Sequence, residues 1–290
     1  MNKIIVYNNF GDDRSAWVKR LSKQSPEGHK WKNVELVTDI RESDYVVVLD
    51  GVGLMDKEEF EIFMKKDKIF IQREPEQVQG RININPDKFV KVVTYNTHPT
   101  YADWWLDMDY DQLRSLSYES LKKDKKNPIC VVTDKAFTDG QRKRLGFLCK
   151  AQHMHDIDFY GKPSLRNLFA NYHGVPEYEH TSTRDKSRIL EYGLSISLEN
   201  GSRRNFFTRT NEDFLCWALP VYWGCPNLQD FFPEDSYRYI DIEAGINKKQ
   251  LEHLLRPPEK HEISAIAEAR DLILNKYNFF PFIESVLAEL

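Results

Sequence analysis

An apolar strand pattern ends in Glu199 and Asn200, in the segment between Leu190 and Asp241. A polar loop and a short helix pattern follow, and a second strand pattern closes at Gly224. Open α/β sheets bind ligands at the carboxyl ends of their strands, and the first turn of a helix presents backbone N–H groups that can bind phosphate. The segment therefore predicts a site for a phosphate-bearing ligand at the edge of a sheet.

Three local groups of basic residues could supply cations for such a ligand. They are Lys122–Lys126, Gln141–Arg144, and Ser202–Arg204 together with Arg209. A guanidinium keeps its charge and binds phosphate oxygens in bidentate fashion, so the arginines are the stronger candidates. The alternative for every one of these arginines is a solvated surface side chain.

Size and charge narrow the class of protein. The chain has 290 residues, 41% of them hydrophobic and 30% charged, which suffices for two domains of about 100–150 residues each. A net charge of −4 argues against a general nucleic-acid binder. The N-terminus enters a strand pattern directly, without a signal peptide, and no apolar run approaches the roughly 20 residues that span a bilayer. We therefore expect a cytoplasmic protein without a membrane span.

The cysteines and histidines give no metal pattern. The four cysteines (Cys130, Cys149, Cys216 and Cys225) lie in apolar or strand-like contexts without Cys-x-x-Cys spacing, which favours buried free thiols over zinc ligands. His153 and His155 are two positions apart, a spacing that does not place both on one helix face. We therefore predict no metal site.

Strand and helix patterns alternate along the chain, which indicates βαβ units with parallel sheets. In the first part, strand patterns cover Lys3–Tyr7, Val34–Thr38, Tyr45–Leu49, Lys68–Gln72 and Phe89–Thr94, and helix patterns cover Ser15–Lys23 and Lys57–Lys66. In the second part, strand patterns cover Pro128–Thr133, Ile157–Gly161, Leu219–Trp223 and Tyr237–Ile242, and a helix pattern covers Gln141–His153.

A polar, lysine-rich stretch between Asp111 and Asn127 separates the two parts and predicts a linker. We therefore predict an N-terminal domain over residues 1–120 and a C-terminal domain over residues 121–290. The helix pattern over Glu262–Leu290 is interrupted near Asn278 to Pro281, where proline predicts a kink or a break. These terminal helices belong either to the second domain or, returning, to the first.

The segment after Leu190 resembles the donor-binding signature of the α1,3/4-fucosyltransferase family. That signature runs Tyr-x-Phe-x-x-x-x-Glu-Asn-Ser, then Tyr-x-Thr-Glu-Lys, then Val-Pro-Val/Ile-x-x-Gly. The residues that match or nearly match it are Tyr192, Leu194, Glu199, Asn200 and Ser202 in the first part, and Pro220, Val221, Tyr222, Trp223 and Gly224 in the last.

The Thr-Glu-Lys core of the signature is altered in this chain. An ungapped count back from Pro220 places Thr208 at the glutamate position and Arg209 at the lysine position. With one gap, Thr208, Arg209 and Thr210 align with the three core residues instead. The acidic residue is missing in both alignments, which bears directly on the sugar donor that the protein uses.

Further segments match the family in the same order along the chain. They are Asp44–Gly51, Gln72–Pro75 and Val92–Asn96 for its N-terminal domain, Arg144–Phe147 and Asp158–Gly161 for its donor domain, and Asn275–Asn278 for its C-terminal helix. The resemblance implies an α/β protein of two Rossmann-like domains facing across a cleft, the GT-B architecture of soluble bacterial or viral members.

The resemblance also implies the roles of individual residues. Glu74, which follows a strand pattern and precedes Pro75, corresponds to the proposed catalytic base; the alternative is an exposed loop carboxylate. Arg144, in its Arg-x-x-Phe match, corresponds to an arginine that contacts the diphosphate. The implied donor-binding residues are Arg144, Glu199, Asn200, Arg209, Thr208, Tyr192 and Lys186.

Aromatic residues gather at the end of the predicted N-terminal domain. We consider Tyr95, Trp104 and Trp105 as an acceptor-binding set, because aromatic faces stack on sugars. The alternative, with equal weight, is packing in the core or at a domain interface.

The resemblance implies an inverting glycosyltransferase that moves a sugar from a nucleotide-sugar donor to a glycan hydroxyl. The resemblance implies GDP-fucose as the default donor, and the altered core leaves a UDP-sugar such as UDP-xylose as an alternative. A relative that binds nucleotide or glycan without turnover is a further alternative. No cofactor or metal is required, and the oligomeric state is open.

Overall fold

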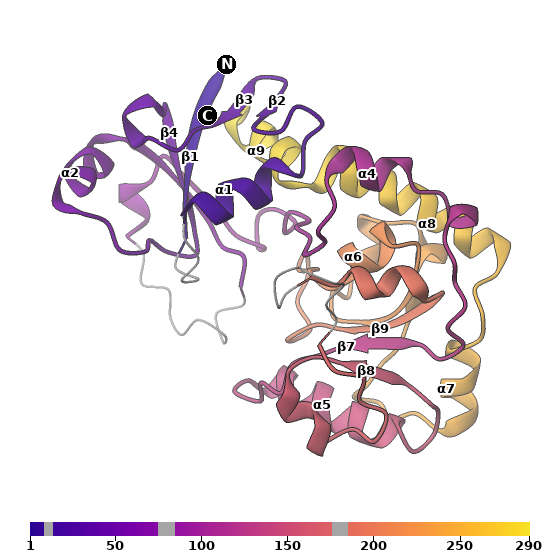
Figure 1. Cartoon of the computed structure of the whole chain (residues 1–290). Helices are drawn as coiled ribbons and strands as arrows, with labels where there is room; N and C mark the ends of the chain where they lie inside the picture. The colour runs from indigo at the N-terminus through magenta and orange to yellow at the C-terminus, as the bar shows by residue number, and fades with distance from the viewer. Residues whose placement is uncertain (9–13, 75–84, 176–184) are drawn as a thin grey trace. The chain divides into compact units, whose positions relative to one another are not determined.

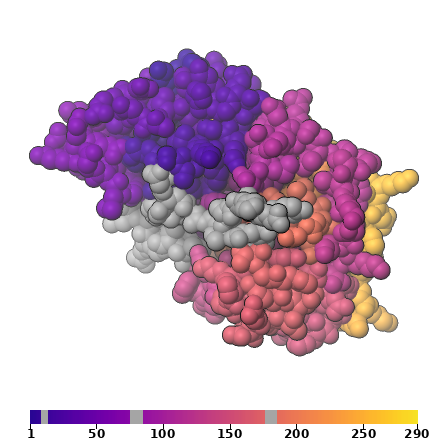
Figure 2. Space-filling view, in the orientation of Figure 1, coloured from indigo at the N-terminus to yellow at the C-terminus, as the bar shows by residue number. Residues whose placement is uncertain are grey.

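The computed structural model describes residues 1–8, 14–74, 85–175 and 185–290, which are drawn in colour (Figure 1; Figure 2). The chain divides into two compact units. The first unit comprises Met1–Tyr101, Asp109–Asp111 and Leu274–Leu290, and the second unit comprises Ala102–Met108 and Gln112–Ile273. Among the described residues, no helix is both long enough and apolar enough to cross a membrane.

The first unit is built on a six-stranded sheet. Its strands are β1 (Asn2–Asn8), β2 (Lys30–Trp31), β3 (Val34–Leu36), β4 (Tyr45–Leu49), β5 (Asp67–Ile71) and β6 (Lys91–Val93), in the order β2-β3-β1-β4-β5-β6. Every pair is parallel except β2 with β3. Its helices are α1 (Arg14–Ser22), α2 (Lys57–Lys65) and α9 (Phe279–Leu287). The five parallel strands thus have the doubly wound order of a Rossmann-like fold.

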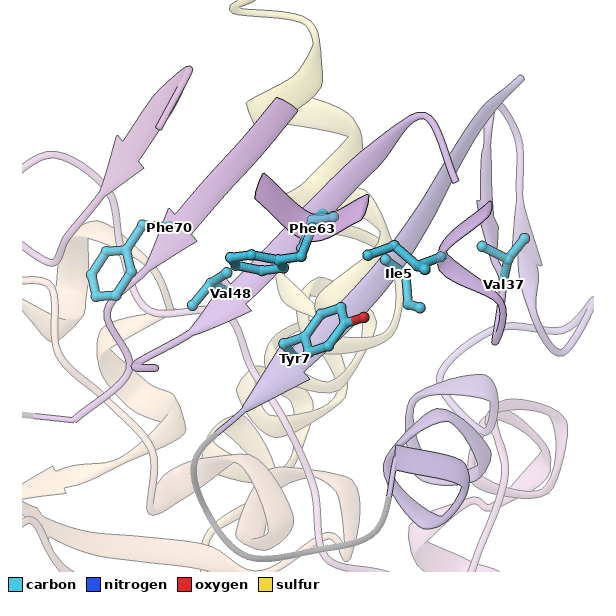
Figure 3. Close-up of a cluster of buried hydrophobic side chains, with 8 residues drawn as sticks. Ile5, Tyr7, Val37, Val48, Phe63 and Phe70 are labelled. Atoms are coloured by element: carbon cyan, nitrogen blue, oxygen red, sulfur yellow. The ribbon is translucent and has the colours of Figure 1, made fainter. Parts of the chain in front are cut away.

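Alternate residues of the parallel strands form the core of the first unit. Ile5 and Tyr7 of β1, Val48 of β4 and Phe70 of β5 lie on one face of the sheet, where Phe63 of α2 packs against them (Figure 3). The rings of Tyr7 and Phe63 meet edge to face with centroids 5.5 Å apart. This packing fixes the carboxyl ends of β4 and β5, from which the loops of the first unit's candidate site emerge.

The second unit contains a five-stranded sheet that is parallel throughout. Its strands are β7 (Ile129–Val131), β8 (Asp158–Tyr160), β9 (Leu194–Leu198), β10 (Leu219–Trp223) and β11 (Arg238–Tyr239), in the order β11-β10-β9-β7-β8. Of these, β7, β8 and β9 are labelled in Figure 1. Its helices are α5 (Asp139–Ala151), α6 (Thr210–Leu215), α7 (Lys248–Leu254) and α8 (Lys260–Leu272), and α4 (Tyr110–Ser115) crosses the boundary between the units. The order reverses between β7 and β9, which makes that point the topological switch of the sheet.

The C-terminal helical segment is interrupted where the chain returns to the first unit. A π-helix over Ile273–Tyr277 follows α8, and Asn278 then caps α9 by accepting a hydrogen bond from the N–H of Phe280 at 3.0 Å. Pro281 lies in the first turn of α9, where a missing N–H leaves no helical hydrogen bond unmade. The predicted α/β fold is confirmed, with a mainly parallel sheet in the first Rossmann-like unit and a parallel sheet in the second.

A buried ion pair joins β11 to α8 in the second unit. Arg238 donates to both carboxylate oxygens of Glu262 at 2.7 and 2.6 Å, and its remaining donors reach the carbonyls of Leu254, Arg256 and Pro257. Both side chains are about one-twentieth exposed.

Glu262→Ala is therefore expected to lower the free energy of unfolding by about 3–5 kcal/mol, because it leaves a buried guanidinium unpaired. Urea denaturation of the two proteins measures this difference. Glu252→Ala is the matched control, because Glu252 lies exposed on α7 and forms a long, solvent-exposed ion pair of 3.8 Å with Lys248. Its replacement should change the free energy of unfolding by less than about 0.5 kcal/mol. A loss under about 1 kcal/mol for Glu262→Ala would show that the pair does not hold α8 to the sheet.

Candidate functional site

The switch point of the second unit's sheet carries most of the predicted donor-binding residues. Thr133 follows β7 and Asn200 follows β9, so the two residues flank the crevice in which open α/β sheets bind ligands. The helix predicted over Gln141–His153 begins earlier, at Asp139, because Thr138 and Gln141 form a capping box. Thr138 Oγ1 also lies 3.4 Å from the carbonyl oxygen of Asn200. The start of α5 is thereby tied to the end of β9.

Gly140 permits this close approach. A Cβ atom at this position would lie 2.1 Å from the carbonyl oxygen of Asn200 and 2.7 Å from the Cα of Gly201. Both neighbours are backbone atoms, which have no rotamer to give way. A glycine in the first turn of α5 is therefore what lets the helix bring Arg144 to the switch point.

Two guanidinium groups converge on one amide oxygen at this edge. Arg144 Nη1 donates to Asn200 Oδ1 at 2.9 Å, and Arg209 Nη2 donates to the same oxygen at 3.4 Å. The other bonds of Arg144 go to the carbonyl of Leu198 and the hydroxyl of Thr133, both at 3.4 Å. We call Arg144 and Arg209 the arginine pair. The structure thus brings together three of the predicted residues: Arg144, Asn200 and Arg209.

The arginine pair has an excess of positive charge. Within residues 1–8, 14–74, 85–175 and 185–290, neither arginine forms an ion pair with a carboxylate, and Arg144 Nε has no hydrogen-bond partner although Arg144 is 1% exposed. Burial, and then the charge of Arg209, lower the pKa of Arg144 to about 9. An anion between the two guanidiniums would relieve this repulsion and satisfy the open donor.

Glu199 has a different surrounding from the one that the sequence suggested. It is completely buried, and its carboxylate accepts hydrogen bonds from the N–H of Thr208 at 2.5 Å, the N–H of Arg209 at 2.9 Å and the hydroxyl of Thr208 at 2.8 Å. Burial raises the pKa of Glu199. Gly224 allows this packing, because a Cβ there would lie 2.3 Å from Glu199 Cγ. Glu199 therefore holds the loop that carries Arg209.

The start of α6, which the sequence suggested as a phosphate site, is buried inside the second unit. The residues Thr210, Asn211, Glu212 and Asp213 are all 2% exposed or less, and the N–H groups of Thr208 and Arg209 that lead into the helix are taken by Glu199. The pattern alone could not show that the segment lies inside the unit. Arg144 is equally buried, but neither it nor Arg209 has a carboxylate partner among the described residues, so the arginine pair is the stronger candidate for an anion site.

Two other predicted donor-binding residues, Tyr192 and Lys186, pair with groups other than Asn200, and Lys186 lies nearer to the arginine pair than Tyr192 does. Tyr192 precedes β9, at the opposite end of the strand from Asn200, and its buried hydroxyl donates to Asp158 at 2.9 Å. Lys186 forms a buried ion pair with Glu212 at 2.8 Å and lines a small cavity together with Arg209. The structure therefore leaves Tyr192 in the core and brings Lys186 near the site.

The aromatic acceptor-binding set is divided between the units. Tyr95 belongs to the first unit, and Trp104 and Trp105 belong to the second. Tyr95 is 7% exposed and Trp104 is 1% exposed, so neither offers a ring face to a sugar, and the packing alternative describes both. Trp105 is partly buried, and its backbone N–H donates to Glu212 Oε1 at 3.1 Å.

Glu74 lies at the carboxyl edge of the first unit's sheet, beside a residue that we did not predict. Asp50 follows β4, and its Oδ1 accepts hydrogen bonds from the N–H of Arg73 at 2.7 Å and of Glu74 at 3.2 Å. Asp50 Oδ2 and Glu74 Oε2 are both buried and, in the part of the chain that the structure describes, have no hydrogen-bond partner. Asp50 has a φ of +61°, which aspartate tolerates better than most residues. The Asp50-Gly51 turn after a β-branched strand was the available signal.

Asp50→Asn is expected to stabilise the protein at neutral pH but not in acid. Burial raises the pKa of Asp50 from 3.8 to about 6, so the folded state holds this proton more tightly than the unfolded state does. The stability contributed by that proton is present below pH 4 and is lost by pH 6 to 7, a difference of about 3 kcal/mol. Asparagine keeps the Oδ1 acceptor without the charge.

Urea unfolding at pH 4 and pH 7.5 measures this effect. We expect Asp50→Asn to exceed the wild type by about 1–3 kcal/mol at pH 7.5 and to match it at pH 4. Asp67→Asn, at an exposed position of β5, should give the same difference at both pH values. If Asp50→Asn and the wild type were equally stable at pH 7.5, burial of a charged Asp50 would not destabilise the folded protein, and the expected raised pKa of Asp50 would be wrong.

Comparison with known proteins identifies the fold. No protein-family model matches the chain, and no curated protein matches its sequence. A crystal structure of α1,3-fucosyltransferase with GDP is 14% identical, with 99% of this chain and 88% of that chain covered and a TM-score of 0.52. Anabaena Alr3699/HepE in complex with UDP is 9% identical, with both chains fully covered and the same TM-score. At these identities the likeness establishes the GT-B glycosyltransferase fold, and it does not separate one family of that fold from another.

Proposed function

We propose that this protein is a glycosyltransferase whose second unit binds the diphosphate of a nucleotide-sugar donor. The observation that carries the proposal is the arginine pair, which meets on Asn200 at the switch point with an open Arg144 donor and no carboxylate partner among the described residues. Diphosphate oxygens are ligands that suit guanidinium groups. Solved structures of the same fold hold GDP in one case and UDP in another.

In the reaction we propose, Glu74 removes the proton from a glycan hydroxyl. The hydroxyl oxygen then forms a bond to the anomeric carbon of the donor, on the face opposite the diphosphate, and the bond between that carbon and the phosphate oxygen breaks. The electron pair of the broken bond leaves with the nucleoside diphosphate, whose growing charge Arg144 and Arg209 stabilise. The configuration at the anomeric carbon is therefore inverted. Asp50 keeps the backbone of Glu74 in place.

The base and sugar of the donor are the finer part of the proposal. GDP-fucose follows from the resemblance to the fucosyltransferase signature. Thr208, which stands at the position of the signature's glutamate in the ungapped alignment, has its hydroxyl bonded to Glu199. The Thr208 hydroxyl therefore does not do the work of the signature's carboxylate, and the donor need not be the one that the signature implies. A UDP-sugar such as UDP-xylose is the alternative donor. A protein that binds nucleotide without turnover is the third candidate.

Thermal-shift titration with GDP, UDP, GDP-fucose and UDP-xylose tests the proposal. A ligand at a hundredfold excess over its dissociation constant adds about 2.7 kcal/mol to the folded state. A shift selective for GDP supports the fucosyltransferase assignment, and one selective for UDP replaces it with a UDP-sugar donor. The absence of any shift would overturn the proposal. Binding without release of nucleoside diphosphate, in the presence of glycan acceptors, would identify the non-catalytic alternative.

A further inference from the structure

An exposed aromatic ring lies in the loop that leads into α5, the helix that carries Arg144. Phe137 lies in the loop between β7 and α5 and is 84% exposed. Its backbone is held on both sides: its N–H donates to Gln141 Oε1 at 2.9 Å, and its carbonyl accepts from Arg142 Nη1 at 3.1 Å. The loop is therefore fixed to the first turn of α5, while the ring faces solvent.

The capping of α5 does not account for this ring. Phe137 immediately precedes the N-cap residue Thr138, a position at which an apolar side chain usually packs on the fourth residue of the helix. That fourth residue is Arg142, whose guanidinium turns instead to the carbonyls of Ala136 and Phe137. The ring thus has no apolar partner in the helix, and its exposure to water is unfavourable.

The position of Phe137 identifies the ligand that would cover the ring. Thr138, the next residue, contacts the backbone of Asn200, and the side chain of Asn200 holds the arginine pair. A nucleotide whose diphosphate lies on these arginines carries its base one ribose away. Every nucleobase presents a flat π face that stacks on an aromatic ring.

We propose that the ring of Phe137 is the surface on which the base of the bound nucleotide stacks. This inference rests on the proposed function, since it needs the diphosphate to occupy the arginine pair. Stacking tolerates any base, so Phe137 adds affinity for both guanine and uracil nucleotides. A purine covers more of the ring than a pyrimidine does, so guanine gains more from it.

Isothermal titration with GDP, UDP and inorganic pyrophosphate separates the base from the diphosphate. For Phe137→Ala we expect the affinity for GDP to fall by about tenfold or more, the affinity for UDP to fall less, and the affinity for pyrophosphate to remain as in the wild type. Phe137→Trp, which retains a stacking face, should keep the affinity for GDP. Phe60→Ala is the control, because Phe60 is an exposed phenylalanine on α2 of the first unit.

Two results would overturn the inference. One is an unchanged affinity of Phe137→Ala for GDP and UDP. The other is an equal loss for pyrophosphate and GDP, which would place the effect on the loop rather than on the base. If the wild-type protein binds neither pyrophosphate nor nucleotide, the proposed function itself fails, and this outcome is recognised before any Phe137 variant is compared.

Discussion

Arg144→Met is expected to weaken the binding of nucleoside diphosphate by about 100-fold or more. Each hydrogen bond to a charged group contributes about 1.5–3 kcal/mol, and two such bonds to a phosphate correspond to this factor. The side chain is 1% exposed and its Nε is unpartnered among the described residues, so a phosphate here binds in a nearly water-free place. Isothermal titration with GDP, UDP and pyrophosphate measures the loss.

Two controls test whether the loss of affinity comes from the missing phosphate contact: a variant of the neighbouring lysine, and the melting temperature of Arg144→Met. Lys143→Met removes one positive charge from the adjacent, half-exposed position of α5, and it should change affinity by less than about threefold. Methionine replaces a buried charge with an apolar chain, so the melting temperature of Arg144→Met should equal or exceed that of the wild type. An affinity within threefold of the wild type for Arg144→Met would rule out the arginine pair as the diphosphate site.

Glu74→Gln is expected to slow sugar transfer by about 10²- to 10⁴-fold, the range of a general base. Glutamine keeps the size of the side chain and the backbone bond to Asp50, but it cannot accept the proton of the acceptor hydroxyl. The affinity for nucleotide should stay unchanged, because Glu74 belongs to the first unit and the arginine pair to the second. The rate of sugar transfer is measured as the release of nucleoside diphosphate at saturating donor.

Glu61→Gln is the control for Glu74. Glu61 is an exposed glutamate of α2 in the same unit, and its replacement should leave the rate within about twofold of the wild type, as surface changes usually do. A fall in kcat without a change in nucleotide affinity would separate a base from a binding residue. A Glu74→Gln enzyme with wild-type kcat would exclude Glu74 as the base, whereas a wild-type protein without turnover would point to the non-catalytic alternative.

Local pattern was sufficient to predict much of the secondary structure. The strands Tyr45–Leu49 and Leu219–Trp223 have their predicted bounds, because short apolar runs with β-branched or aromatic residues favour the extended conformation. The helix over Gln141–His153 was placed two residues late, since the capping box of Thr138 decides its start. Fold class followed from the alternation of these elements.

The candidate site depended on contacts that no local pattern contains. Arg144 and Asn200 were each predicted, but their meeting needs β7 and β9 to be neighbours and Gly140 to let α5 approach. Glu199 was predicted to bind the donor, and the structure adds that it is buried and that its bonds to Thr208 and Arg209 shape the loop. Asp50 was noticed only as part of the Asp44–Gly51 segment that matches the family.

The sequence by itself therefore determined the elements of this protein, its class and the chemical types present at the ends of its strands. Only the tertiary structure decided which of those polar groups share one place, which are buried and which keep an open hydrogen-bonding atom. The reason is physical. Strand and helix formation depend on neighbours in sequence, whereas burial, charge repulsion and the pairing of donors with acceptors depend on residues that are distant in sequence and adjacent in space.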